Sequence, residues 1–220
     1  MRTRLSAVAA ALAVGAALPA AASAAQIQTD QACYQDNTGL VAVTGNGFDP
    51  DQPYQVALDG QPLPTSALDK TDAAGGISGA FETPQLARED VHVYTLQVTQ
   101  GANVATTTFS VSPFSADFKP GSGNPKTLHV RFNVFGFGLA RPNPTVFLHY
   151  VRPNGKLKRT IRLGKAQGAC GTIKRTSRKK LFPFQAERGK WKLQFDTQRK
   201  YRKAHRPFVT IDVIIRRVFG

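Results

Sequence analysis

The sequence predicts an all-β protein built of two tandem antiparallel β-sandwich domains behind an export signal. Short runs of β-branched and aromatic residues recur along the chain, and turn residues such as Gly45-Asn46-Gly47 separate them. No segment shows the sustained 3.6-residue apolar period of an amphipathic helix. The 220 residues are 41% hydrophobic and 20% charged, which suffices for two cores and excludes disordered, coiled-coil and multi-pass membrane chains.

The first residues have the three-part layout of a secretory signal peptide. Arg2 and Arg4 precede an apolar run of 14 residues at 5–18, and small residues then lead to the A-x-A sequence at 22–24. The run is shorter than the roughly 20 residues that span a bilayer. We therefore expect cleavage after Ala24 and a mature product that is secreted or held at the cell surface. The alternative is an uncleaved N-terminal anchor.

Charge divides the rest of the chain into two halves of opposite sign. Residues 30–117 contain 11 acidic and two basic residues, a net charge of −9, whereas residues 118–220 contain three acidic and 25 basic residues, a net charge of +22. The sign changes across 112–125, a stretch rich in Pro, Gly and Ser that is typical of a domain boundary. We therefore expect a signal peptide at 1–24, an acidic sandwich at 25–117 and a basic sandwich at 118–220.

Both halves contain segments that fit strands. In the first half the segments are 40–44, 54–58, 91–98 and 105–111. In the second half, apolar residues alternate with polar ones, so that one face of each segment is expected to point into the core. These inward residues are Leu128, Val130, Phe132 and Val134; Val146, Leu148 and Tyr150; and Trp191, Leu193 and Phe195. Residues 209–215 are expected to form the last strand.

One part of the first half resembles the immunoglobulin-like modules of secreted bacterial proteins, of IPT/TIG or Big type. It comprises GNGFDPDQPYQVALDGQPL, then TDAAGGISGAFETPQL, then VYTLQV and TTTFSV. The likeness covers roughly 40–111 and rests on a G-x-G-F-x-P turn after an early strand and on a V-x-L-D-G hairpin. It implies an immunoglobulin-like sandwich that serves as a spacer, presenter or binder at a cell surface. We identify no family for the second half.

Cys33 and Cys170 are the only cysteines, one in each half. Because an exported chain enters an oxidising compartment, we expect a disulfide between them that joins the two domains. The alternative is two separate buried thiols. His149 and His205 could in principle activate Cys170, but the Ser-His-Gly that precedes the nucleophile of L,D-transpeptidases is absent, so we expect no catalytic cysteine.

No sequence signature of catalysis occurs. The chain lacks G-x-S-x-G, a Walker loop, G-x-G-x-x-G and H-E-x-x-H. The histidines have no metal-ligand spacing, and alternation places His129 and His149 on outward strand faces as solvated side chains. Calcium is an alternative for clustered carboxylates, although Asp is ordinary in turns. Those carboxylates are Asp49, Asp51, Asp69 and Asp72. We expect no enzyme, no cofactor and no bound metal.

The basic residues of the second half form three clusters, which we expect to bind a polyanion. They are Lys156, Lys158 and Arg162; Lys174, Arg175, Arg178, Lys179 and Lys180; and Arg199, Lys200, Arg202, Lys203 and Arg206. In the first cluster, alternation places the residues at 156, 158, 160 and 162 on one face and those at 157, 161 and 163 on the other. Arg159 would then point inward, unless a bulge reorients it or it pairs with an acidic residue.

A surplus of positive charge repels itself, and a counter-polyanion would relieve the repulsion. We expect the partner to be an anionic envelope polymer or membrane surface: a wall phosphate polymer, an acidic glycan or anionic lipid. A specific nucleic acid is not expected, because the aromatic residues alternate inward instead of forming stacking platforms. The basic domain could instead be merely soluble or docked on the acidic half.

Two further hypotheses belong to other classes of function. The chain could be a protein-interaction or assembly subunit whose acidic and basic halves pair between molecules. It could also be an accessory domain of an envelope hydrolase, which would require a concave site that gathers Glu187, Asp196 or Asp212.

Overall fold

The computed structural model describes residues 24–64, 70–87, 90–203 and 206–216. The predicted signal peptide lies outside these residues, apart from Ala24. Every regular element in the described part of the chain is a β-strand, as the sequence predicts. In the same residues, no helix has the length and apolarity needed to cross a membrane.

The first sandwich consists of a three-stranded and a five-stranded sheet. The smaller sheet has the order β1 (Gln26–Thr29), β3 (Leu40–Asn46), β6 (Ile77–Glu82). The larger has the order β2 (Cys33–Gln35), β8 (Asn103–Ser112), β7 (His92–Gln100), β4 (Gln55–Leu58), β5 (Gln61–Pro62). Strand β2 runs parallel to β8, and the other pairs are antiparallel. Val41, Leu96, Phe109 and Val111 are among the buried residues that fill the space between the sheets.

The second sandwich consists of a three-stranded and a four-stranded sheet. The smaller sheet has the order β13 (Lys179–Lys180), β10 (His129–Phe135), β9 (Ser115–Lys119). The larger has the order β12 (Leu157–Lys165), β11 (Thr145–Val151), β14 (Gly189–Asp196), β15 (Val209–Ile215). The predicted inward residues of β10, β11 and β14 form its core, which confirms the alternation; Leu128 packs against that core from the segment before β10.

Both sandwiches repeat one strand order. If β2 is set aside, β1 and β3 to β8 correspond in chain order to β9 to β15. The sheets β1-β3-β6 and β5-β4-β7-β8 then match β9-β10-β13 and β12-β11-β14-β15. In each, the third, sixth and seventh strands lie side by side, which is the arrangement of an immunoglobulin-type sandwich. The chain is therefore a tandem of immunoglobulin-like domains.

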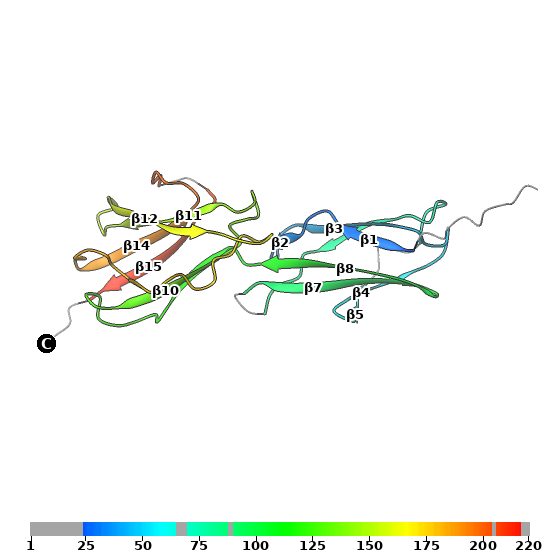
Figure 1. Cartoon of the computed structure of the whole chain (residues 1–220), viewed down its shortest axis with the longest axis horizontal. Coiled ribbons are helices and arrows are strands. Elements are labelled where there is room, and N and C mark those ends of the chain that lie inside the picture. Colours follow the sequence, from blue (N-terminus) through cyan, green and yellow to red (C-terminus); the bar gives the residue numbers. More distant parts are fainter. Residues whose placement is uncertain (1–23, 65–69, 88–89, 204–205, 217–220) are drawn as a thin grey trace, which may run out of the picture.

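The two sandwiches lie end to end (Figure 1). The chain passes between them at Pro113 and Phe114, and the ring of Phe114 packs 4.9 Å from that of Phe137. Strand β9 pairs with β10 from Ser115 to Lys119. The predicted boundary at 117/118 therefore falls inside a strand of the second sandwich.

A disulfide between Cys33 and Cys170 also joins the sandwiches, as predicted. Cys33 begins β2, and Cys170 lies in the connection after β12. This connection approaches the backbone at Gly138 so closely that a Cβ at Gly171 would collide with it. The Phe137 amide donates to the Gly171 carbonyl at 3.1 Å, and the Gly138 amide donates to the Cys170 carbonyl at 3.0 Å. The cystine therefore links β2 to a well-anchored loop of the second sandwich.

We predict that replacing both cysteines, Cys33→Ser with Cys170→Ser, lowers the free energy of unfolding. The bond spans 137 residues, and a loop of this length corresponds to about 4–5 kcal/mol of loop-closure entropy. Urea unfolding of the oxidised wild type and the variant measures the difference. Ser177→Ala, at an exposed position, is the control and is expected to stay within about 0.5 kcal/mol of wild type. Two titratable thiols in denatured, unreduced wild-type protein would contradict the bridge.

Candidate functional site

The outer face of the sheet β12-β11-β14-β15 is polar, whereas its inner face lines the core. His149 of β11 lies opposite Thr160 of β12 and Gln194 of β14. Arg162 and Asp196 lie two residues further along the same face, because alternate strand residues point the same way. The face therefore combines a histidine, a carboxylate and a hydroxyl with part of the first basic cluster.

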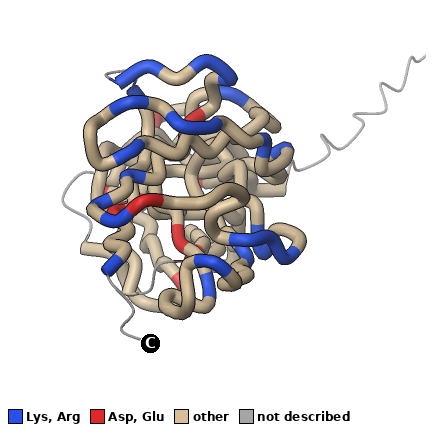
Figure 2. Tube along the Cα trace, turned by 90° about the vertical axis from the view of Figure 1, so that its left-hand side faces the viewer, with Lys and Arg blue, Asp and Glu red and all other residues tan. Residues whose placement is uncertain are grey.

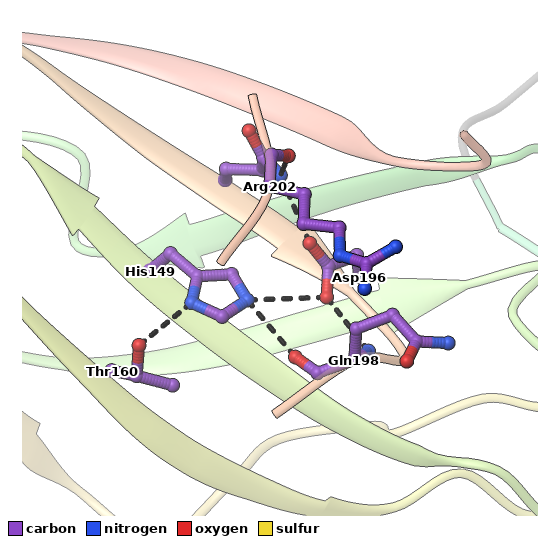
Figure 3. Close-up of polar contacts among 6 residues, drawn as sticks. His149, Thr160, Asp196, Gln198 and Arg202 are labelled. Carbon is purple, nitrogen blue, oxygen red and sulfur yellow. Dashed lines mark hydrogen bonds and ion pairs between the residues drawn. The ribbon is translucent and has the colours of Figure 1, made fainter. Parts of the chain in front are cut away.

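The prediction that His149 is a solvated side chain is wrong, because its exposed fraction is 0%. Residues 197–203, which follow β14, fold back over this face and cover the ring. His149 Nδ1 lies 2.7 Å from Thr160 Oγ1, and Nε2 lies 3.1 Å from both Asp196 Oδ1 and the Gln198 carbonyl (Figure 3). The sequence gives the face of His149 correctly but contains no signal for the loop that covers it.

Asp196 fixes the covering loop through its own hydrogen bonds. Its Oδ1 accepts a bond from the Gln198 amide at 2.8 Å, and its Oδ2 accepts one from Gln194 Nε2 at 2.9 Å. Gln194 Nε2 also donates to the Arg202 carbonyl at 3.2 Å. The loop is therefore held at two backbone points by side chains of the sheet beneath it.

The pKa of the Asp196 carboxyl is below its ordinary value. Burial is the largest single influence and raises this pKa, but the hydrogen bonds from His149, Gln194 and the Gln198 amide together outweigh it. Asp196 is thus ionised at neutral pH within the cluster. Burial also raises the pKa of Tyr201, whose ring lies 5.5 Å from the His149 ring.

The hydrogen-bond partners of His149 determine its tautomer. A carboxylate oxygen of Asp196 and the carbonyl oxygen of Gln198 are both acceptors, so Nε2 carries a proton. In the neutral ring, Nδ1 is then an acceptor and receives the hydroxyl proton of Thr160. The buried ring therefore connects a carboxylate on one side to a hydroxyl on the other.

A bulge in β12 changes the predicted facing of the first cluster. The register shifts between Tyr150 and Val151 of β11, and Leu157 comes to lie opposite Val151 on the outer face. Leu157 is consequently 42% exposed instead of buried. Lys158 Nζ lies over the Phe184 ring at 5.7 Å from its centre, so Lys158 does not share the outer face.

Arg159 lies opposite Tyr150, on the side of β12 that alternation predicts, and the bulge does not reorient it. This residue is exposed, and its Nη1 donates to the Pro183 carbonyl at 3.2 Å. It therefore needs no acidic partner.

The structure brings the first and third clusters together at an open hollow of about 470 Å³. The lining residues come from β11, β12 and the covering loop. They are Thr145, Phe147, Thr160, Arg162 and Arg199. Thr160, bonded to His149 from behind, thus reaches the hollow beside two guanidinium groups.

A second hollow of about 450 Å³ also lies on this face. It contains Lys203 of the third cluster together with Arg152, Lys190 and Lys192, which the sequence analysis did not include among the binding residues. The alternation around Trp191 places Lys190 and Lys192 outward and could have identified them. Lys190 also forms a 2.7 Å ion pair with Asp212.

The second cluster belongs to another part of the domain. Lys179 and Lys180 form β13 in the three-stranded sheet. Lys174 pairs with Asp90 of the first sandwich at 3.1 Å. A view onto the free end of the second sandwich shows Lys and Arg around its periphery and few acidic residues (Figure 2). The positive charge therefore surrounds the domain, and the outer face collects only part of it.

The three acidic residues of the second half lie apart from one another in the structure. Asp196 is buried against His149. Asp212 lies on β15 and pairs with Lys190 of β14. Glu187 is exposed and precedes β14. Neither hollow on the outer face is lined by more than one of the three. No group of three or more metal-ligating side chains occurs among the residues that the structure describes.

Comparison with known proteins identifies no family. No family model matches the chain, and no curated protein does. Among solved structures, Rst D1-D2 is 12% identical over 86% of this chain and 97% of its own, with a TM-score of 0.35. The titin Ig tandem A164-A165 is 16% identical over 86% and 94%, with a TM-score of 0.32.

Trypsin-activated α-2-macroglobulin from Escherichia coli is also similar, with 14% identity over 78% of this chain and a TM-score of 0.33. This chain spans only 14% of that protein's length. At such similarity these neighbours carry no argument about function.

We predict that Asp196→Asn destabilises the protein at pH 7 by about 1–3 kcal/mol, because it weakens a buried hydrogen-bonded group. The folded-state pKa of Asp196 is lowered. Its contribution is therefore complete above the unfolded-state value, near 3.9, and is lost as the pH falls through the folded-state value. The deficit of the variant should shrink between pH 5 and pH 2 in urea unfolding.

The matched control is Asp212→Asn, which removes an exposed carboxylate paired with Lys190. It is expected to change stability by less than about 1 kcal/mol at any pH. A deficit of Asp196→Asn that stays constant from pH 7 to pH 2 would contradict the ionised buried carboxylate.

Proposed function

We propose that the chain is an exported, non-catalytic protein whose second sandwich binds an anionic polymer of the cell envelope. The observation that carries this proposal is the convergence of arginines and lysines without acidic partners on the outer face of the second sandwich. Among the described residues, Lys174 and Lys190 are the only Lys or Arg residues in a salt bridge. The other Lys and Arg residues of this domain that the structure describes have no acidic partner.

The shape of the face favours an extended ligand. Its two hollows are open, lie along one sheet face, and are each lined by basic residues. An extended polyanion can contact both hollows, and each contact releases counterions, so affinity is supplied by charge. Phosphate-bearing wall polymers, acidic glycans and anionic lipid surfaces all have this chemistry.

The first sandwich fits the role of an acidic spacer. It is joined to the second end to end, by the chain at Pro113 and by the Cys33–Cys170 bond, and does not lie over the outer face of β11 and β14 (Figure 1). We propose that it is one of the IPT/TIG- or Big-like modules of secreted bacterial proteins. Its net negative charge would keep it away from the anionic surface that the second sandwich contacts.

We predict that binding of the mature protein to fractionated envelope material weakens at least about tenfold between 50 and 200 mM salt. A variant with Gln at Arg162, Arg199, Lys200 and Lys203 should bind about tenfold or more weakly at 100 mM salt. Co-sedimentation of the labelled protein measures both effects.

The matched control carries Gln at Arg175, Arg178, Lys179 and Lys180, which removes the same charge from the second cluster. It should lose only about two- to threefold, through the general field of the domain. Equal losses in both variants would contradict the outer face as the binding surface. Salt-sensitive self-association in sedimentation velocity, without envelope binding, would favour the assembly subunit instead.

A further inference from the structure

The hollow between β12 and the covering loop has the composition of a specific oxyanion site. Arg162 and Arg199 approach it from different elements, and Thr145 and Thr160 add hydroxyl groups. None of the residues that line it is acidic, and neither guanidinium group has a hydrogen bond or ion pair to another described residue. Guanidinium groups match the oxygens of phosphate and carboxylate through paired hydrogen bonds.

His149 controls which hydrogen-bonding group Thr160 presents to the hollow. With a neutral ring, Thr160 donates its proton to Nδ1 at 2.7 Å, and only oxygen lone pairs remain for a ligand. With a protonated ring, Nδ1 becomes a donor to Oγ1, and the Thr160 proton is free to point into the hollow. An anion is repelled by lone pairs and bound by a donated proton.

Three elements pack against His149: β12, β14 and the covering loop. The charged and titratable groups near the ring come from these elements. Asp196 of β14 contacts Nε2, and Tyr201 of the covering loop lies against the ring. Arg162 and Arg199 line the same hollow as Thr160. An anion in the hollow would neutralise the two arginines and bring negative charge toward the ring.

We propose that this hollow binds a phosphate group of the anionic polymer through Arg162, Arg199 and the Thr160 hydroxyl, and that binding is coupled to protonation of His149. The proposal rests on the polyanion binding proposed above and identifies the group that is recognised. Three donors arranged around one open hollow suit a phosphate, because its two free oxygens can accept from all of them. By linkage, the His149 ring takes up a proton when an anion that prefers the protonated ring binds.

The test uses a fluorescently labelled glycerol phosphate oligomer that has no terminal phosphate monoester, so that all its phosphates are diesters and its charge is constant between pH 5.5 and 8.5. Every protein carries His205→Gln, so that this histidine, which lies between β14 and β15 in the sequence, does not titrate. Fluorescence anisotropy at fixed ionic strength should show affinity rising about three- to tenfold from pH 8.5 to pH 5.5. Calorimetry in buffers of different ionisation enthalpy should show proton uptake.

Two isosteric variants separate the coupling from the shape of the hollow. Thr160→Val removes the hydroxyl beside His149 and should lower affinity at pH 5.5 and abolish the pH dependence. Thr145→Val removes a hydroxyl from the same hollow without touching His149 and should keep the pH dependence. Thr160→Ser, which restores the hydroxyl, should recover both properties. Persistence of the pH dependence in Thr160→Val would overturn the coupling.

Charge variants test the hollow independently of general polyanion binding. Arg162→Gln with Arg199→Gln should weaken binding about tenfold more than Lys156→Gln with Lys200→Gln, which removes the same charge outside the hollow. Equal losses would overturn the phosphate site and leave the proposed function intact, whereas no loss in either would overturn both. Tighter binding of polygalacturonate or phosphatidylglycerol vesicles than of the oligomer would overturn the choice of a polymer phosphate.

A hydroxyl, an imidazole and a carboxylate in series also form the connectivity of a nucleophilic triad. The binding assay therefore includes a measurement of released glycerol phosphate. Hydrolysis of the oligomer by wild type that disappears in Thr160→Val would overturn the binding site in favour of a catalytic one.

Discussion

The buried contact between His149 and Asp196 determines the shape of the basic face. Together with Gln194, this pair supplies the polar anchors that hold residues 197–203 to the sheet that they cover. The anchors work through backbone atoms: the amide and carbonyl of Gln198 and the carbonyl of Arg202 bond to side chains of the sheet. Because such bonds are directional, they fix the path of the loop and therefore the positions of the cations that it carries.

The net charge changes sign along the length of the molecule, from negative in the first half to positive in the second. The two halves of opposite sign lie end to end, and one ion pair, Lys174–Asp90, connects them among the described residues. Most of the opposite charges of the two halves are therefore not paired with each other within one chain. The Cys33–Cys170 bond and the short passage at Pro113 hold the sandwiches in this extended arrangement, in which the acidic domain does not cover the basic face.

The sequence predicts those features that depend on local alternation. Trp191 and its neighbours two residues apart reveal a half-buried strand because one face packs and the other does not, and the structure confirms it. Strand β9 is harder to predict because it lies in the Pro- and Gly-rich stretch that resembles a linker. Arg162 and Arg199 are 37 positions apart in the sequence. Their convergence depends on a loop that folds back onto a sheet, and no local pattern encodes that path.

The composition of the buried cluster supports a positioning role over a purely stabilising one. A buried histidine–carboxylate pair often contributes no more stability than apolar residues of the same size, because both groups lose their hydration. Apolar residues at 149 and 196 would fill the same space, but they would provide no bonds to the loop backbone and no partner for Thr160. A cationic loop gains little from nonspecific packing against a basic sheet. The polar pair is therefore best explained by what it orients: the loop on one side and the hydroxyl at the hollow on the other.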